Sequence, residues 1–70
     1  MKLETVAHAK RAARRDARLF AREYPGERLS GDWDSEAFSF YQRPTGQRQY
    51  DAVWNAYRKT LHAEVERRIK

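Results

Sequence analysis

Apolar residues recur every three or four positions along two long stretches of the chain, the spacing that places them on one face of an α-helix. In the first stretch they are Val6, Ala9, Ala13, Ala17, Phe20 and Tyr24. In the second they are Tyr50, Trp54, Tyr57, Leu61, Val65 and Ile69, with Val53 at the edge. The pattern predicts helices over residues 3–24 and 47–69. Pro25 and Gly26 end the first helix, and Thr45 is a candidate N-cap for the second.

Residues 25–46 form a mixed connector between the two predicted helices. Asp34 or Ser35 can cap a short helix over residues 34–42, which ends before Pro44. The alternation of Phe38 and Phe40 is also compatible with a short strand. We favour the helix, because the chain offers no second strand for pairing.

These elements predict a single all-α domain over residues 1–70, with two long antiparallel helices and a short central helix or ordered connector. A chain of this length buries only about 60% of the surface that its unfolded form exposes. Ala9, Ala13 and Ala17 form a stripe of small residues that allows close helix packing, either on the chain's own last helix or on a second copy. The thin core favours a homodimer, which can be intertwined, over a monomer.

The formal net charge of +5 is distributed unevenly. Residues 1–24 carry seven Lys or Arg against three Asp or Glu. At about 100° per residue, the arginines of this segment fall on the face opposite the apolar stripe. They are Arg11, Arg14, Arg15, Arg18 and Arg22. Several of them form like-charge pairs at i,i+4, which destabilise a helix, so this face is a candidate binding surface for an acidic partner.

The last helix has the opposite arrangement of charge. Glu64 precedes Arg67 and Arg68 by three and four residues, and Glu66 precedes Lys70 by four. Such pairs stabilise a helix surface. The contrast sets the first helix apart as the one whose positive charge is not balanced locally.

Two interpretations of the arginine face stay open. Acidic residues of the connector can fold back over it and form an internal network of ion pairs, or the face can be free to bind a partner. The acids in question are Glu27, Asp32, Asp34 and Glu36. The connector aromatics allow a similar choice, since Trp33, Phe40 and Tyr41 can close the core or act as exposed interface anchors, a role in which Trp, Tyr and Arg are enriched.

A second surface has the chemistry to read nucleic acid. If the short helix and the last helix are joined by the turn at residues 43–46, they approximate a helix-turn-helix motif. The N-terminal turns of the last helix then present side chains that can hydrogen-bond to bases, namely Gln47, Arg48, Gln49 and Asn55.

The sequence contains few signals of other classes of function. The chain has no cysteine, and its two histidines, His8 and His62, lie far apart, so we expect no metal site. No glycine-rich phosphate loop or activated nucleophile is recognised, and we expect neither catalysis nor a cofactor nor a small-molecule substrate. No stretch approaches the roughly 20 apolar residues of a membrane span, and no secretory signal is recognised, so we expect a cytoplasmic protein.

The sequence therefore predicts a small non-catalytic regulator or inhibitor that contacts an acidic protein surface through the arginine face and the connector aromatics. The alternative is a nucleic-acid-binding regulator that uses the same arginines or the start of the last helix. In size and composition the chain resembles small accessory proteins of phages and plasmids, but it carries no motif that assigns it to a family.

Overall fold

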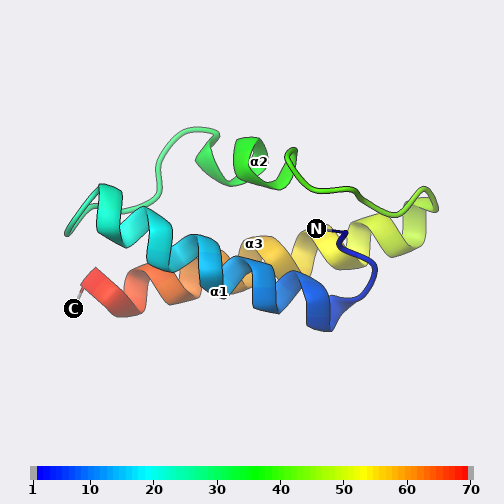
Figure 1. The fold of residues 1–70 in the computed structure, drawn as a ribbon, viewed down its shortest axis with the longest axis horizontal. Coiled ribbons are helices and arrows are strands. Elements are labelled where there is room, and N and C mark those ends of the chain that lie inside the picture. The colour runs from blue at the N-terminus through cyan, green and yellow to red at the C-terminus, as the bar shows by residue number, and fades with distance from the viewer. Residues whose placement is uncertain (1, 70) are drawn as a thin grey trace.

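The computed structural model, which describes residues 2–69, contains three helices that run back and forth along one axis (Figure 1). They are α1 (Val6–Glu23), α2 (Trp33–Phe38) and α3 (Gln47–Ile69). The two long helices pack along their length, and α2 lies over them on one side (Figure 1). This arrangement confirms the predicted helical class with two long helices in contact.

The predicted antiparallel orientation of the long helices is wrong, because α1 and α3 run parallel (Figure 1). Near the N-terminal ends of both helices, the amide of Leu3 donates to the carbonyl oxygen of Gln42 at 2.8 Å. Near their C-terminal ends, Arg28 Nε lies 3.5 Å from a carboxylate oxygen of Glu66. The connector therefore returns along the full length of α1 before α3 begins, and α2 is the backward pass of an up-down-up arrangement.

The bounds of α1 are shorter than the predicted 3–24. The helix begins at Val6, after Thr5, whose hydroxyl accepts a hydrogen bond from the amide of His8 at 3.1 Å. Leu3 fits the helical spacing but lies in an extended segment, where it is fully buried and Lys2 forms an isolated parallel bridge with Gln42. Tertiary pairing of this segment outweighs the local preference for helix.

The other two helices bear out the remaining secondary-structure predictions to different degrees. The last helix occupies residues 47–69 as predicted, although Gly46, not Thr45, directly precedes it. The short helix is confirmed over the strand alternative, but it covers residues 33–38 instead of 34–42. It begins ahead of the expected caps. Residues 39–46 then lead to α3 through a turn at 39–40 and irregular backbone that contains the bridge at Gln42.

The core lies between α1 and α3. Alanines of α1 with no exposed surface face larger apolar side chains of α3, so the two helix backbones approach closely. The buried residues are Ala9, Ala12, Ala13, Ala17, Val53, Tyr57, Leu61 and Val65. The alanine stripe is thus occupied by the chain's own last helix, and a second copy has no access to it while α1 and α3 stay packed.

Phe38 attaches α2 to α3. Its ring lies 4.8 Å from that of Trp54 and 5.2 Å from that of Tyr57, measured between centroids. A second contact between α2 and α3 is polar: His62 Nε2 lies 2.9 Å from a carboxylate oxygen of Asp34. Because α2 packs on α3 through these contacts, its other side faces α1 across an open cleft.

Candidate functional site

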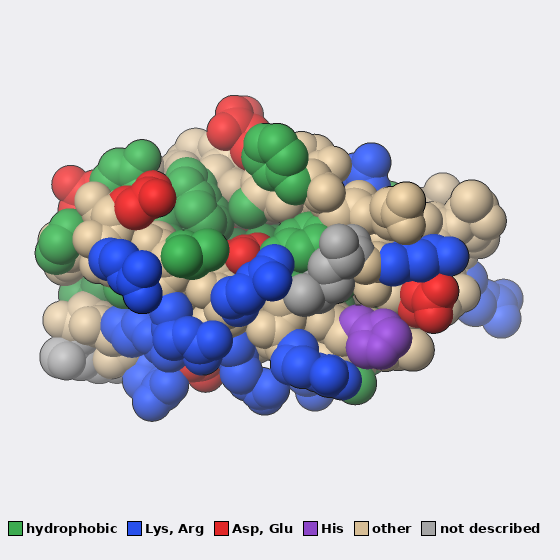
Figure 2. Space-filling view, in the orientation of Figure 1, with side chains coloured by type: hydrophobic (Ala, Val, Ile, Leu, Met, Phe, Trp, Pro, Cys, Tyr) green, Lys and Arg blue, Asp and Glu red, His purple; other side chains and the backbone are tan. Residues whose placement is uncertain are grey.

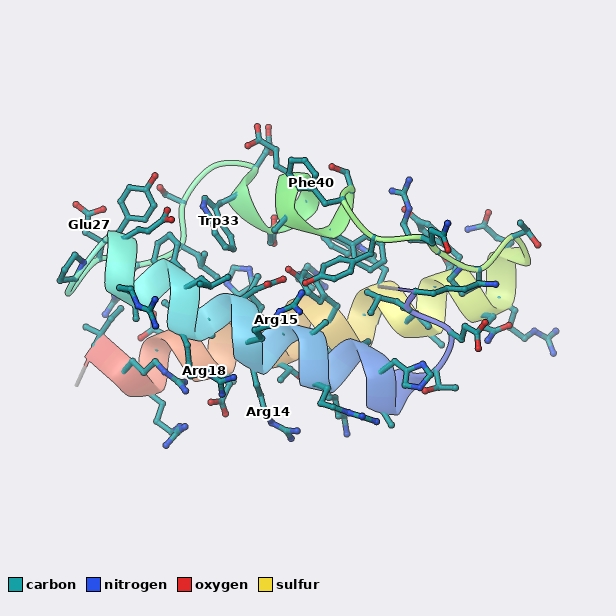
Figure 3. The ribbon with its side chains drawn as sticks, in the orientation of Figure 1. Arg14, Arg15, Arg18, Glu27, Trp33 and Phe40 are labelled. Carbon is teal, nitrogen blue, oxygen red and sulfur yellow. The ribbon has the colours of Figure 1, made fainter. Side chains whose placement is uncertain are left out.

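The arginine row of α1, which consists of Arg11, Arg14, Arg15, Arg18 and Arg22, is exposed over its whole length. At a rise of 1.5 Å per residue, it spans about 16 Å of the helix. Figure 2 shows it as a band of basic side chains along the lower part of this face. In Figure 3, Arg14 and Arg18 point away from α2, whereas Arg15 extends towards it.

The acidic residues of the connector do not cover the arginine row. Within residues 2–69, no carboxylate oxygen of Glu27, Asp32, Asp34 or Glu36 lies within 4.0 Å of a basic nitrogen of the row. Asp34 pairs with His62 instead, and Glu27 lies beside the C-terminal end of α1 (Figure 3). Of the two interpretations of this face, the structure matches the one in which the connector leaves it open.

The charges of α3 are paired as predicted. Glu64 accepts hydrogen bonds from Arg67 at 2.8 Å and Arg68 at 2.7 Å, and these bonds lower the pKa of Glu64 to about 2. Glu66 contacts Arg28 at 3.5 Å, while its predicted pairing with Lys70 lies outside the described residues. The basic residues in the last turn of α3 are therefore paired with Glu64, whereas those of the arginine row, apart from Arg15, have no acid within 4.0 Å among the described residues.

A cleft of about 480 Å³, here called the aromatic cleft, lies between α1 and α2 beside the arginine row. Leu19, Trp33, Ala37 and Phe40 supply its apolar walls. The polar residues that line it are Arg15, Asp16, Glu23, Glu36 and Tyr41. Figure 2 shows hydrophobic side chains gathered in the upper part of this face, directly above the basic band.

The predicted aromatic anchors occupy three different environments. Phe40 is 88% exposed and points outward at the edge of the cleft (Figure 3). Trp33 is half-buried, with its ring set edge-on to that of Phe20 at 5.0 Å, and forms a wall. Tyr41 is buried and belongs to the core. Trp33 and Phe40 are therefore available to a partner, whereas Tyr41 supports the cleft from below.

The polar floor of the cleft is Asp16, a charged residue whose burial in the core was not predicted. Only 7% of this residue is exposed. Its Oδ2 atom accepts hydrogen bonds from the hydroxyls of Tyr41 and Tyr57, each at 2.6 Å. Asp16 follows Ala12 by four residues and precedes Phe20 by four, so its place on the apolar face was visible in the sequence.

This network shifts the titration of the groups around Asp16. Burial raises the pKa of Tyr41 to about 12, and the hydrogen bond to Asp16 adds to the rise. The same two causes raise the pKa of Tyr57 further. Arg15 donates to the Tyr41 hydroxyl at 2.9 Å, and this bond is the main cause of a rise in the pKa of Arg15. Arg15 therefore links the arginine row to the buried network.

The residues of the alternative nucleic-acid surface are partly engaged within the chain. Gln47 donates to Asp51 at 2.8 Å, and Gln49 donates to the backbone carbonyl of Glu4. Arg48 and Asn55 are exposed. Eight residues, 39–46, separate α2 from α3, which is longer than the turn of about 3–4 residues in a helix-turn-helix.

Comparisons with protein-family models, curated proteins and solved structures find no match to this chain. Within residues 2–69, no three His, Asp or Glu side chains converge as a metal site would require. No helix in that range is both long and apolar enough to cross a bilayer.

Proposed function

We propose that this chain is a non-catalytic regulatory or inhibitory protein that acts by contact with an acidic protein surface. The observation that carries the proposal is the juxtaposition of two features on one face. The arginine row, which no acidic residue of the connector covers, lies next to the aromatic cleft, at whose edge Phe40 is exposed. Charge complementarity at the row would orient the partner, and a partner side chain in the cleft would supply apolar burial.

The composition of the cleft favours a protein over a nucleic acid. Glu23 and Glu36 line it, and their carboxylates would repel phosphates that approach beside the row. The exposed side chains of Phe40 and Leu19, 88% and 43% exposed respectively, suit an apolar side chain of a protein partner. Arg and aromatic residues together are typical of the centre of protein interfaces.

Nucleic-acid binding is the second candidate, and it rests on the row alone. Exposed arginines spread over about 16 Å of one helix can contact successive phosphates.

We also propose that the protein acts in the cytoplasm. A homodimer, if it forms, would have to use a face other than the alanine stripe, since those alanines are fully buried against α3.

The experiment is affinity capture from the native host after nuclease treatment, with paired charge-reversal variants. Arg14→Glu with Arg18→Glu removes the centre of the row. Arg58→Glu with Lys59→Glu makes the same charge change at exposed positions of α3. If each row arginine contributes about 1–2 kcal/mol, the row variant weakens capture at least about 30-fold.

The two candidates give different results in this design. The proposal is supported if a protein is still captured after nuclease treatment and its capture is weakened by the row variant but not by the α3 variant. Recovery that nuclease abolishes, together with a steep loss of binding as salt rises, supports nucleic acid instead. Equal capture by both variants would show that the row is only a solvated surface.

A further inference from the structure

A second hollow, of about 420 Å³, is lined almost entirely by basic side chains, and we call it the basic hollow. The lining residues are Lys2, His8, Arg11, Arg15 and Arg18. Four of them lie three or four positions apart on α1, so they share one side of that helix. Lys2 comes from the N-terminal extended segment, which the bond from Leu3 to Gln42 holds beside α1.

Much of the positive charge of this hollow is uncompensated. Lys2 lies 3.1 Å from Glu4, and Arg15 Nε lies 3.8 Å from Asp16. Over the described part of the chain, Arg11 and Arg18 have no carboxylate within 4.0 Å. Cations that line a concave surface reinforce one another's potential and concentrate anions there.

His8 adds a further polar group without a partner. Its Nδ1 atom is buried and has no hydrogen-bond partner within residues 2–69. A buried ring nitrogen of this kind is costly unless something bonds to it. Because the Nδ1 atom is itself buried, an anion in the hollow does not reach it, and the four lysine and arginine side chains carry the argument for anion binding.

We propose that the basic hollow binds a small, multiply charged oxyanion of the di- or triphosphate class. Guanidinium groups bind phosphate oxygens in a two-pronged geometry, and several cations around one hollow call for a ligand with several negative charges in a small space. The volume lies within the range of small-molecule sites. This proposal goes beyond the proposed function and does not rest on it.

Titration calorimetry of the full chain with sodium tripolyphosphate, at ionic strength held constant with NaCl, tests the site. The hollow variant is Arg11→Gln with Arg18→Gln. The matched control is Arg58→Gln with Lys59→Gln, which removes the same charge from α3. We expect saturable binding of one tripolyphosphate per chain, weakened at least tenfold in the hollow variant and less than twofold in the control. Circular dichroism confirms that each variant is folded.

Three outcomes would overturn the proposal. They are no saturable binding by the wild-type chain, equal weakening in both variants, and binding of a twelve-residue oligothymidylate without any binding of tripolyphosphate. The last outcome would favour the nucleic-acid candidate. Arg11, Arg15 and Arg18 belong to both the row and the hollow. The two proposals are measured separately, by titration with tripolyphosphate and by capture of a protein, so either can fail while the other stands.

Discussion

Replacing Tyr57 by phenylalanine isolates the energetic role of the buried Asp16 network. The change keeps the ring, which packs against Phe38 and Trp54, and removes only the hydroxyl that donates to Asp16 at 2.6 Å. A hydrogen bond to a charged group contributes about 1.5–3 kcal/mol, and its loss leaves the carboxylate with Tyr41 as its remaining tyrosine donor. For a domain of 70 residues, whose total stability is about 4–10 kcal/mol, this loss is large.

Urea unfolding followed by circular dichroism measures the effect, and thermal unfolding should show a decrease in Tm of about 6–24 °C. Tyr50→Phe is the control, because Tyr50 also packs against Phe38 but its hydroxyl has no hydrogen-bond partner among the described side chains. A double-mutant cycle of Tyr57→Phe with Asp16→Ala should give a coupling free energy of about 1–2 kcal/mol. Equal destabilisation by Tyr57→Phe and Tyr50→Phe, or a coupling near zero, would refute this account of the network.

Three further predictions concern the core, the tyrosines and the cleft. Ala13→Leu inserts a larger side chain where no surface is exposed and should cost about 1–3 kcal/mol in urea unfolding, whereas Ala63→Leu on the exposed side of α3 should cost little. Tyr41 and Tyr57 have raised pKa values, so their contribution to stability should be constant below pH 10, where unfolded tyrosine titrates, and should fall as the pH rises towards 12. A flat denaturation midpoint from pH 9 to 12 would contradict this. Phe40→Ser should leave the urea midpoint unchanged because the side chain is 88% exposed, yet weaken partner capture; a lower midpoint would mean that Phe40 supports the fold.

The helices were predictable where one strong pattern acts alone. In α3 the apolar stripe continues without interruption from Tyr50 to Ile69, and the predicted bounds of 47 and 69 match the structure. For α1 the predicted helix begins too early, at Leu3, which fits the helical spacing but is fixed by a bond to Gln42, 39 positions away. Val6 and Tyr24 also fit the spacing, yet both are 41% exposed, so the buried part of the stripe lies between them.

The parallel orientation of the long helices was not predictable from the same patterns. A helical stripe has no direction, so it specifies which side packs but not which end meets which. Direction depends on the path of residues 24–46, which is fixed by the packing of Phe38 on α3 and the return of the chain to Leu3. These are long-range contacts, and no local propensity encodes them.

The surface features also divide into those that follow from a local pattern and those that depend on long-range contacts. The exposure of the arginine row was predictable, because it lies opposite a stripe that must be buried. The burial of Asp16 was not predicted, since a charged residue enters a core only when specific donors satisfy it, and its donors lie 25 and 41 positions away. The cleft beside the row depends on α2 packing mainly on α3 through Phe38 and touching α1 through Trp33 and Phe20, and these are again long-range contacts.

Site-specific photo-crosslinking tests most directly the claim that the row and the aromatic cleft form one partner-binding surface. A photoreactive phenylalanine at position 40 replaces an exposed ring at the edge of the cleft, and the same residue at position 58 reports from an exposed site on α3. In native-host extract treated with nuclease, we predict a discrete protein adduct from position 40 that is absent from position 58 and is lost on Arg14→Glu with Arg18→Glu. Adducts that are the same from both positions, or that persist after the charge reversal, would contradict the claim.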